Sequence, residues 1–246
     1  MKTLSNLFYL LKGFFFPSAC ALCGQSLLSA QEIKFALCES CNSEITGAQN
    51  SALIREREQK CGLCGKPLIS EQGICLPCRN GKEKPWDRFW VLFPYAGKYR
   101  KLLSEYKFSK NLALVNLFAH KALEVIASNA ELENAVIVPV PPRAGKIKDS
   151  GWDQVDYLVR KIMKLHSGKI AVSRCLKRKK SRVQKKLSRS ERAENLKGRI
   201  FHYGEVPRIA LVIDDVITTG STMEVCCASL KEAKADKVYG FCLFYD

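Results

Sequence analysis

The chain has 246 residues, of which 40 are Lys or Arg and 24 are Asp or Glu, so its formal net charge is +16. Its hydrophobic content of 47% is enough to bury a core, which excludes an intrinsically disordered chain. The longest apolar stretch, residues 7–16, is interrupted by Lys12, whereas a membrane-spanning helix needs about 20 apolar residues. The composition therefore predicts one or two folded domains and no integral membrane protein.

The first predicted element is a helix at the N-terminus. Its apolar residues recur at near-helical spacing: Leu4, Leu7, Phe8, Leu11 and Phe15. Such a stripe packs on its own domain, which is the commoner case, or docks on a membrane surface or a partner protein.

Eight of the twelve cysteines form four Cys-x-x-Cys pairs before residue 80. In each pair both thiolates can face one tetrahedral ion, so two pairs complete a closed zinc site. Four pairs predict two structural Zn²⁺ ions, while sequential and cross-braced pairing both remain open. A disulfide framework suits a short secreted chain, so we expect a reducing, cytoplasmic location. The predicted ligands are Cys20, Cys23, Cys38, Cys41, Cys61, Cys64, Cys75 and Cys78.

The chain is predicted to have two domains. Residues 1–82 are expected to form a double zinc ribbon with the N-terminal helix, and metal binding should supply its folding free energy. From residue 83 to residue 246 strand-like and helix-like segments alternate, which predicts an α/β domain with a mostly parallel sheet covered on both faces. Strands are predicted at 89–94, 136–140, 209–213 and 238–244, and helices at 112–128, 154–165 and 222–235.

Most of the net charge lies in one segment, from Arg174 to Arg199. Twelve basic and two acidic residues give it +10, while the other 220 residues carry only +6. A solvated helical face normally mixes both signs, so this segment favours a polyanionic partner. Single-stranded nucleic acid fits, with Trp152, Phe201 and Tyr203 as either stacking residues or core residues.

The most specific motif follows the aliphatic strand at 209–213, where Asp214 and Asp215 precede a short loop and a helix. Ligands of open α/β sheets bind at the carboxyl ends of strands, and backbone N–H groups at a helix N-terminus hold anions. Carboxylates beside such a loop can also accept hydrogen bonds from vicinal hydroxyls. The motif therefore predicts a sugar-phosphate site, with the phosphate held by Thr218, Thr219, Gly220, Ser221 and Thr222.

This motif resembles the phosphoribosyl pyrophosphate (PRPP) signature of type I phosphoribosyltransferases, and the resemblance covers most of residues 87–246. It implies a Rossmann-like domain that binds PRPP with Mg²⁺. Asp214 and Asp215 would act as the catalytic acids at the ribose 2′ and 3′ hydroxyls, and the loop would surround the 5′-phosphate. The resemblance also implies a pyrophosphate loop, often with a cis X-Pro bond at 140–141 or 141–142, formed by Val140, Pro141, Pro142, Arg143 and Lys146.

The whole layout resembles the ComF (GntX-like) family, which joins a double zinc ribbon to a phosphoribosyltransferase-like domain. Gly151 to Gln154 parallel that family's Arg-Gly-Phe-Asn-Gln motif, but Ser150, Trp152 and Asp153 replace Arg, Phe and Asn. One anion contact is therefore missing, and a negative charge is added near the diphosphate. Residues of the basic segment are expected to form a lid that also contacts nucleic acid: Arg182, Gln184, Lys185, Lys186, Arg189 and Arg192.

The ComF resemblance implies a cytoplasmic competence protein for natural transformation. Such a protein binds PRPP and single-stranded DNA, assists the transport of incoming DNA, and docks peripherally at the inner membrane on a DNA channel and its helicase. The alternative is an active phosphoribosyltransferase with an unidentified nitrogenous acceptor. No general base is visible for that reaction, since Thr218 stands where hypoxanthine-type members carry a carboxylate. A regulator that senses PRPP is a third reading.

Overall fold

The computed structural model describes residues 18–56, 60–65, 68, 71–81, 83–167, 170–179 and 198–246. The chain divides into two compact units, one made of residues 1–58 and 95–118, the other of residues 59–94 and 119–246. The predicted boundary at residue 82 concerns which segments fold independently, and it stays a prediction. The N-terminal helix lies outside the described residues.

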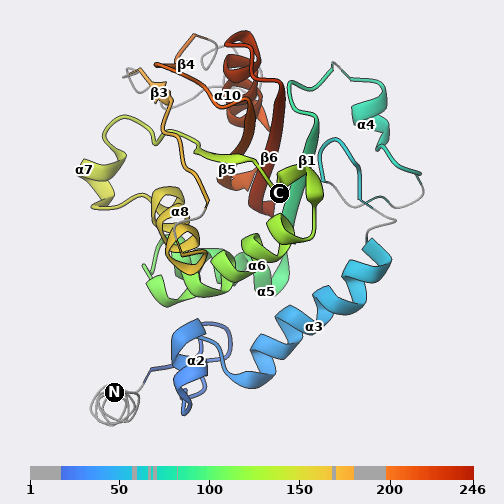
Figure 1. Cartoon of the computed structure of the whole chain (residues 1–246). Helices are drawn as coiled ribbons and strands as arrows, with labels where there is room; N and C mark the ends of the chain where they lie inside the picture. Colours follow the sequence, from blue (N-terminus) through green and yellow to red (C-terminus); the bar gives the residue numbers. More distant parts are fainter. Residues whose placement is uncertain are drawn as a thin grey trace. The chain divides into compact units, whose positions relative to one another are not determined.

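The larger unit is built on a parallel sheet of four strands (Figure 1). Their order is β1 (Arg88–Pro94), β6 (Lys237–Tyr245), β5 (Ile209–Ile217) and β2 (Val136–Pro139), and each neighbouring pair is parallel. A separate antiparallel ribbon pairs β3 (Leu176–Arg178) with β4 (Ile200–His202). The predicted α/β class with a mostly parallel sheet is confirmed.

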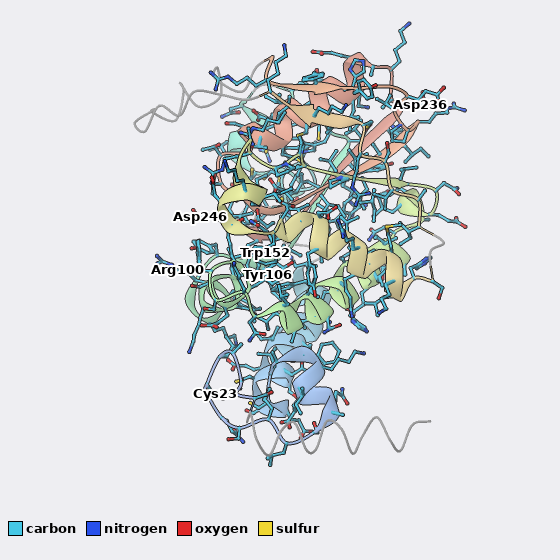
Figure 2. All side chains as sticks on the ribbon, turned by 90° about the vertical axis from the view of Figure 1, so that its left-hand side faces the viewer. Cys23, Arg100, Tyr106, Trp152, Asp236 and Asp246 are labelled. Atoms are coloured by element: carbon cyan, nitrogen blue, oxygen red, sulfur yellow. The ribbon has the colours of Figure 1, made fainter. Side chains whose placement is uncertain are left out.

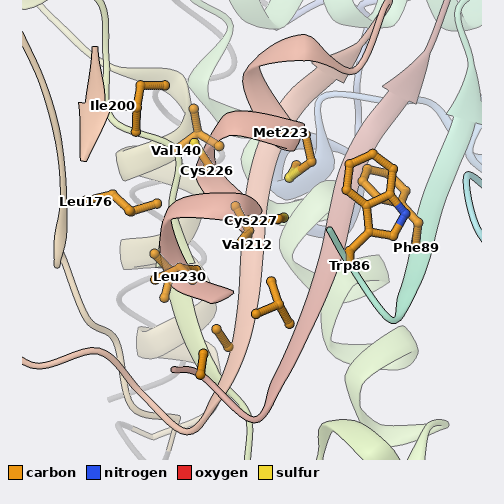
Figure 3. Packing of buried hydrophobic residues seen from close by; sticks show 14 of the residues in the cluster. Trp86, Phe89, Val140, Leu176, Ile200, Val212, Met223, Cys226, Cys227 and Leu230 are labelled. Atoms are coloured by element: carbon orange, nitrogen blue, oxygen red, sulfur yellow. The ribbon is translucent and has the colours of Figure 1, made fainter. Parts of the chain in front are cut away.

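Helices cover both faces of this sheet, as its continuous apolar strands require. Neighbouring strand residues point to opposite faces, and Ala210, Leu211, Val212 and Ile213 are all buried. On one face, α10 (Ser221–Glu232) and the β3–β4 ribbon pack on the sheet around a core that includes Val212 (Figure 3). On the other face, α8 (Gln154–Leu165) contacts β2 and β5.

The edge strand β1 is covered by the segment that carries the last two cysteine pairs. The Trp86 indole N–H donates to the Leu63 carbonyl, and Lys60 Nζ lies 3.5 Å from the Val91 carbonyl. Gly65 has a φ of +69°, and a Cβ added there would lie 3.0 Å from the Val91 side chain. This covering protects an edge that would otherwise offer unpaired backbone groups to other chains.

The smaller unit is helical in its described part. It contains α2 (Ala30–Phe35), α3 (Glu39–Glu56), α5 (Gly97–Lys107) and η1 (Leu112–Leu114). Ser29 and Glu32 form a capping box at the start of α2. Tyr106 of α5, labelled in Figure 2, is fully buried. Its ring meets that of Phe118 edge-on, with the ring centres 5.2 Å apart. The remaining elements are α4 (Leu76–Arg79), α6 (Val115–Ala127), η2 (Ala130–Leu132) and α7 (Lys146–Ser150).

The predicted element bounds agree in most places with those observed. Helix α8 has the predicted bounds, β1 and β2 differ from prediction by one residue at one end, and β6 is one residue longer at each end. The predicted helix at 112–128 is divided into η1 and α6. Strand β5 continues four residues past its predicted end, because residues 214–217 keep pairing with β6. Among the described helices, none combines the length and the apolarity needed to cross a bilayer.

Candidate functional site

The first two Cys-x-x-Cys pairs meet in the smaller unit, where Figure 2 marks Cys23. Their four sulfur atoms all lie within 4.8 Å of one another, and those of Cys23 and Cys38 are 3.7 Å apart. Four sulfurs at about 2.3 Å from a tetrahedral zinc ion would be separated by about 3.8 Å. The cluster therefore fits a closed structural zinc site, made by Cys20, Cys23, Cys38 and Cys41.

The last two pairs form an equivalent cluster in the larger unit. Its sulfur atoms also lie within 4.8 Å of one another, with 3.7 Å between Cys64 and Cys75. The N–H group of Gly65 donates to the Cys61 carbonyl at 2.8 Å, as the N–H group of Gly24 does to the Cys20 carbonyl in the first cluster. The pairing that the sequence left open is therefore sequential. The second set of ligands is Cys61, Cys64, Cys75 and Cys78.

Backbone N–H groups within each cluster favour a thiolate. Burial alone would raise the pKa of Cys20, but hydrogen bonds from N–H groups, led by that of Cys23, lower it to about 6. Burial likewise opposes ionisation of Cys61, and N–H groups led by that of Cys75 lower its pKa to about 7. Because zinc binds the thiolate form, each cluster has one ligand prepared for metal near neutral pH.

The two acids of the second motif lie within β5 and not beyond its end. Since alternate residues of a strand face opposite sides, Asp214 and Asp215 leave opposite faces of the sheet. Asp215 is 7% exposed and accepts a hydrogen bond of 2.5 Å from the Gln154 amide of α8. Asp214 is half-buried on the α10 side, where its charge contributes to raising the pKa of buried Cys226, an effect due mainly to burial.

The loop after β5 leads into α10 as the sequence predicts. Gly220 is the N-cap of the helix and has a φ of +79°. This left-handed backbone conformation would be strained for a residue with a side chain. The Thr219 and Ser221 hydroxyls are 2.9 Å apart, and the Ser221 N–H group lies 3.3 Å from Thr219 Oγ1. Thr218 is exposed, and Thr222 lies in the first turn of the helix. These hydroxyls and the first N–H groups of α10 provide donors for an anion.

Arg178 is a further cation of this site, contributed by β3. Burial lowers the pKa of its guanidinium, the charge of Arg143 lowers it too, and Asp214 acts in the opposite direction. The charges of Cys226, Arg143 and Asp214 thus all act on Arg178, which brings this cation into the surroundings of the candidate site. As one of twelve basic residues in its segment, it carries no distinguishing sequence signal. On β3 it lies two residues after the buried Leu176, so both side chains face the same side of the ribbon.

The predicted pyrophosphate loop follows β2, and the Val140 N–H group donates to the Ile213 carbonyl at 3.0 Å. Val140 and Pro141 are buried, whereas Pro142 and Arg143 are exposed. The prediction of a cis X-Pro bond in this loop is wrong, because every peptide bond of the described residues is trans. Lys146 forms an ion pair of 2.6 Å with Asp153.

The structure describes the basic segment only at its two ends, residues 174–179 and 198–199. The lid residues Arg182, Gln184, Lys185, Lys186, Arg189 and Arg192 lie outside the described residues. The flanking strands β3 and β4 pair with each other, and Lys177 lies opposite Phe201. Lys177 Nζ is 3.5 Å from the centre of the Tyr203 ring, and Lys179 Nζ is 5.5 Å from that of Phe201. Tyr203 is 64% exposed, and its position favours a surface role over core packing.

A cavity of about 760 Å³ lies at the opposite end of the sheet, near the start of β2. Its lining includes Leu132, Val136, His166 and Leu211. Ligands of open α/β sheets bind at the carboxyl ends of the strands, where Asp214 and the α10 loop are found. The cavity is therefore separate from the candidate site.

Comparisons with known proteins find similarity along nearly the full chain. The chain is 27% identical over 235 residues to Competence protein ComFC of Streptococcus pneumoniae, covering 91% of this chain and 98% of the relative. It is 26% identical to Competence protein F of Haemophilus influenzae, covering 91% and 95%. It is 28% identical to DNA utilization protein YhgH of Escherichia coli, covering 92% and 96%. No family model matches the chain.

Proposed function

Because the chain belongs to the ComF family of competence proteins, we propose that it assists the uptake of single-stranded DNA during natural transformation. The observation that carries this proposal is the likeness to relatives named for competence or DNA utilization over more than nine tenths of each chain. The protein would act in the cytoplasm, peripherally at the inner membrane, with the DNA channel and its helicase as partners.

The β3–β4 ribbon is the proposed DNA-binding surface. Leu176 and Ile200 face the core, so the alternate residues of both strands face outward. The outward residues are lysines and aromatics, namely Lys177, Lys179, Phe201 and Tyr203. Aromatic rings can stack on bases without regard to sequence, and lysines can neutralise the phosphates. The lid residues between these strands would extend the same cationic surface.

The site at Asp214 and the α10 loop is proposed to bind PRPP with Mg²⁺. Asp214 and Asp215 offer carboxylate oxygens, which suit both ribose hydroxyls and Mg²⁺. The loop from Thr218 to Thr222 offers N–H and hydroxyl donors to the 5′-phosphate, and Arg143 and Arg178 supply positive charge. Mg²⁺ would neutralise part of the phosphate charge, while the residues of the chain hold and orient the sugar.

The alternative function, an active phosphoribosyltransferase, rests on the same acids and loop. It requires that PRPP lose its diphosphate to a nitrogenous acceptor. Release of pyrophosphate from PRPP with Mg²⁺, measured across a panel of nucleobases and nucleic acids, separates the two functions. Release with a small base would favour the enzyme, and its absence with every acceptor would favour a binding role.

The proposed DNA surface is tested by fluorescence anisotropy with a labelled oligothymidylate at several salt concentrations. We expect Tyr203→Ala to weaken binding by roughly tenfold, given about 1–3 kcal/mol for a stacked base, and Lys177→Ala to weaken it by removing a phosphate contact. Lys177→Ala should also reduce the salt slope by about 0.7. Arg208→Ala is the matched control, since it removes an exposed cation before the start of β5, at the other end of the sheet.

Two results would contradict this proposal. Equal effects of Lys177→Ala and Arg208→Ala would show that binding follows net charge alone and not the ribbon. In a naturally transformable host that lacks its own copy, a normal transformation frequency with the Tyr203→Ala protein would also count against a role of the ribbon in uptake. The wild-type protein must restore transformation in the same strain.

A further inference from the structure

Lys146 of the predicted pyrophosphate loop is held by a neighbouring acid. Among the described cations of this loop, it is the one whose side chain is mostly buried. Its Nζ lies 2.6 Å from Asp153 Oδ2, and the two side chains are 19% and 5% exposed. In the ComF-like motif this acid stands in place of an asparagine. The lysine charge is therefore neutralised within the protein, next to the position where a diphosphate would need it.

The surrounding contacts hold this pair in place. The second oxygen of Asp153 accepts the N–H group of Asp156 at 2.8 Å and so caps α8. The Ser150 hydroxyl lies 2.7 Å from the Lys146 carbonyl oxygen and 2.9 Å from that of Trp152. Helix α7 is thus joined to the N-terminus of α8 at both its ends. A lysine that turned toward a ligand would leave Asp153 charged, buried and without its cation, which is costly.

The net charge of the pyrophosphate loop also indicates that little positive charge is left for a diphosphate. From Pro142 to Asp153 there are three cations, Arg143, Lys146 and Lys148, and two acids, Asp149 and Asp153, so the segment has a net charge of only +1. The loop on the 5′-phosphate side, Thr218 to Thr222, contains no acid of its own. The acid in the first turn of α10, Glu224, forms an ion pair with Lys84. The pyrophosphate loop therefore offers the diphosphate little net charge of its own, whereas the donors of the 5′-phosphate loop are not offset by an acid within that loop.

We propose that this site takes a ribose 5-phosphate without a 1-diphosphate, as the free sugar phosphate or as a nucleoside 5′-monophosphate, about as readily as PRPP. The proposal rests on the proposed function, because it concerns the same acids and loop. Ligand selection is set by the Lys146–Asp153 pair, which withholds a cation from the diphosphate.

The test uses the full-length, zinc-loaded protein and isothermal titration with three probes, each with Mg²⁺: PRPP, ribose 5-phosphate and adenosine 5′-monophosphate. In the wild-type protein, we expect PRPP to bind less than about tenfold more tightly than the better of the two monophosphates. Whichever monophosphate binds better identifies the free sugar phosphate or the nucleotide as the ligand.

Asp153→Asn is the decisive variant. Asparagine caps a helix as well as aspartate does, so α8 is kept while Lys146 loses its ion pair. PRPP should then bind about tenfold more tightly, because one charge-assisted hydrogen bond becomes possible, while ribose 5-phosphate stays within about threefold. Adding Lys146→Gln to Asp153→Asn should remove the gain. Thermal unfolding of both variants verifies that they remain folded.

The possible failures have different meanings. A preference of the wild-type protein for PRPP above about a hundredfold would overturn this inference and leave the proposed function intact. An equal gain for both ligands in Asp153→Asn would also overturn it, since the pair would then not act on the diphosphate. Failure of all three probes to bind would remove the sugar-phosphate half of the proposed function together with the inference.

Discussion

Consecutive residues of one strand have different surroundings in this protein. Asp215 is buried and held by Gln154, whereas Asp214 is half-buried on the opposite face, near Arg178. The Asp215 N–H group donates to Asp214 Oδ1 at 2.8 Å, so the Asp214 carboxylate is held as well. Both carboxylates are thus oriented before any ligand arrives, which reduces the conformational entropy lost on binding.

Replacing both Asp214 and Asp215 by alanine should abolish thermal stabilisation by PRPP with Mg²⁺, because the ribose hydroxyls lose their acceptors. Binding of oligothymidylate at low salt should persist, since the cations of the β3–β4 ribbon are unchanged. Differential scanning fluorimetry and anisotropy measure the two properties on the same sample. Equal loss of both would show that the two sites are one, or that the variant is not folded.

Gly240 of β6 is required by an aromatic ring on the neighbouring strand. A Cβ at this position would lie 2.3 Å from ring atoms of Phe89, its partner in register on β1. Phe89 is itself buried against Trp86, with ring centres 5.3 Å apart, and has little freedom to move. Glycine is thus dictated here by the packing of its neighbour.

The variant Gly240→Ala should therefore lower the free energy of unfolding by about 1–3 kcal/mol, as overpacking of a core does. Combining it with Phe89→Leu should cost less than the sum of the two single changes, because the smaller side chain leaves room for the methyl group. Urea unfolding of the three variants measures this coupling. Additive losses would contradict the predicted clash.

At the scale of elements, one acid ties three segments of the larger unit together. Asp87, just before β1, accepts hydrogen bonds from Lys231 of α10 at 2.9 Å, and from Lys237 and the Val238 N–H group of β6 at 3.2 and 2.8 Å. Burial alone would raise the pKa of Asp87, but these donors, led by Lys231, lower it below its usual value. The stabilisation is therefore present above the ordinary aspartate pKa and is lost as the pH falls through the lowered pKa.

We expect Asp87→Asn to lower the free energy of unfolding at pH 7 by about 1 kcal/mol, after allowance for the solvent exposure of the lysines. The difference between wild type and variant should shrink as the pH falls below about 4, where the carboxyl of the unfolded wild-type chain takes up a proton, and vanish below the lowered pKa of the folded state. Urea unfolding at pH 7 and at several acidic pH values measures it. A difference that does not change with pH would mean that the carboxylate charge has no part in this junction.

Elements with a strong pattern could be predicted from sequence, whereas those fixed by tertiary pairing could not. Helix α8 has an N-cap at Asp153 and a clear apolar face, and its bounds were predictable from these alone. Strand β5 extends beyond its predicted end because β6 continues to pair with it, although its acids suggest a strand end. The β3–β4 ribbon has three residues in each strand, too few for a detectable alternation.

The candidate site shows the same limit. The acids and the α10 loop are contiguous in sequence, so their motif could be recognised there. Arg178 reaches the site through the β3–β4 pairing, and the Lys146–Asp153 ion pair depends on how α7 meets α8. Spacing along the chain carries no information on either contact. The cysteine motifs could be recognised in the same way, but the sequence did not indicate which pairs share an ion, and the structure does.

At the scale of the whole molecule, the two cysteine clusters belong to different compact units. Each cluster has four ligands with no open position, so each metal would stabilise the unit that contains it. The second cluster also lies in the segment that covers the edge strand β1 through Trp86 and Gly65. Metal loading should therefore affect the sheet as well as the cysteine segments.

The wild-type protein should release close to two zinc ions per chain when a chelator is added under denaturing conditions. Cys20→Ser and Cys61→Ser should each release one, because each removes a ligand from a different cluster. A colorimetric zinc indicator provides the measurement. One ion or none from the wild-type protein would overturn the assignment of two four-cysteine sites, and loss of both ions from either variant would show that the sites are not independent.

The pairing of β3 with β4 also allows the chain between them, residues 180–198, to be replaced without disturbing the sheet. The Lys179 N–H group donates to the Arg199 carbonyl at 2.8 Å, so the two ends of the intervening chain are held one hydrogen bond apart. A two-residue Asn-Gly turn spans such a gap. Homologues could therefore lengthen, shorten or replace this insert with little effect on the sheet, because the closure entropy changes only slowly with length. A chimeric protein that carries another relative's insert should therefore still fold, whatever the effect on DNA binding.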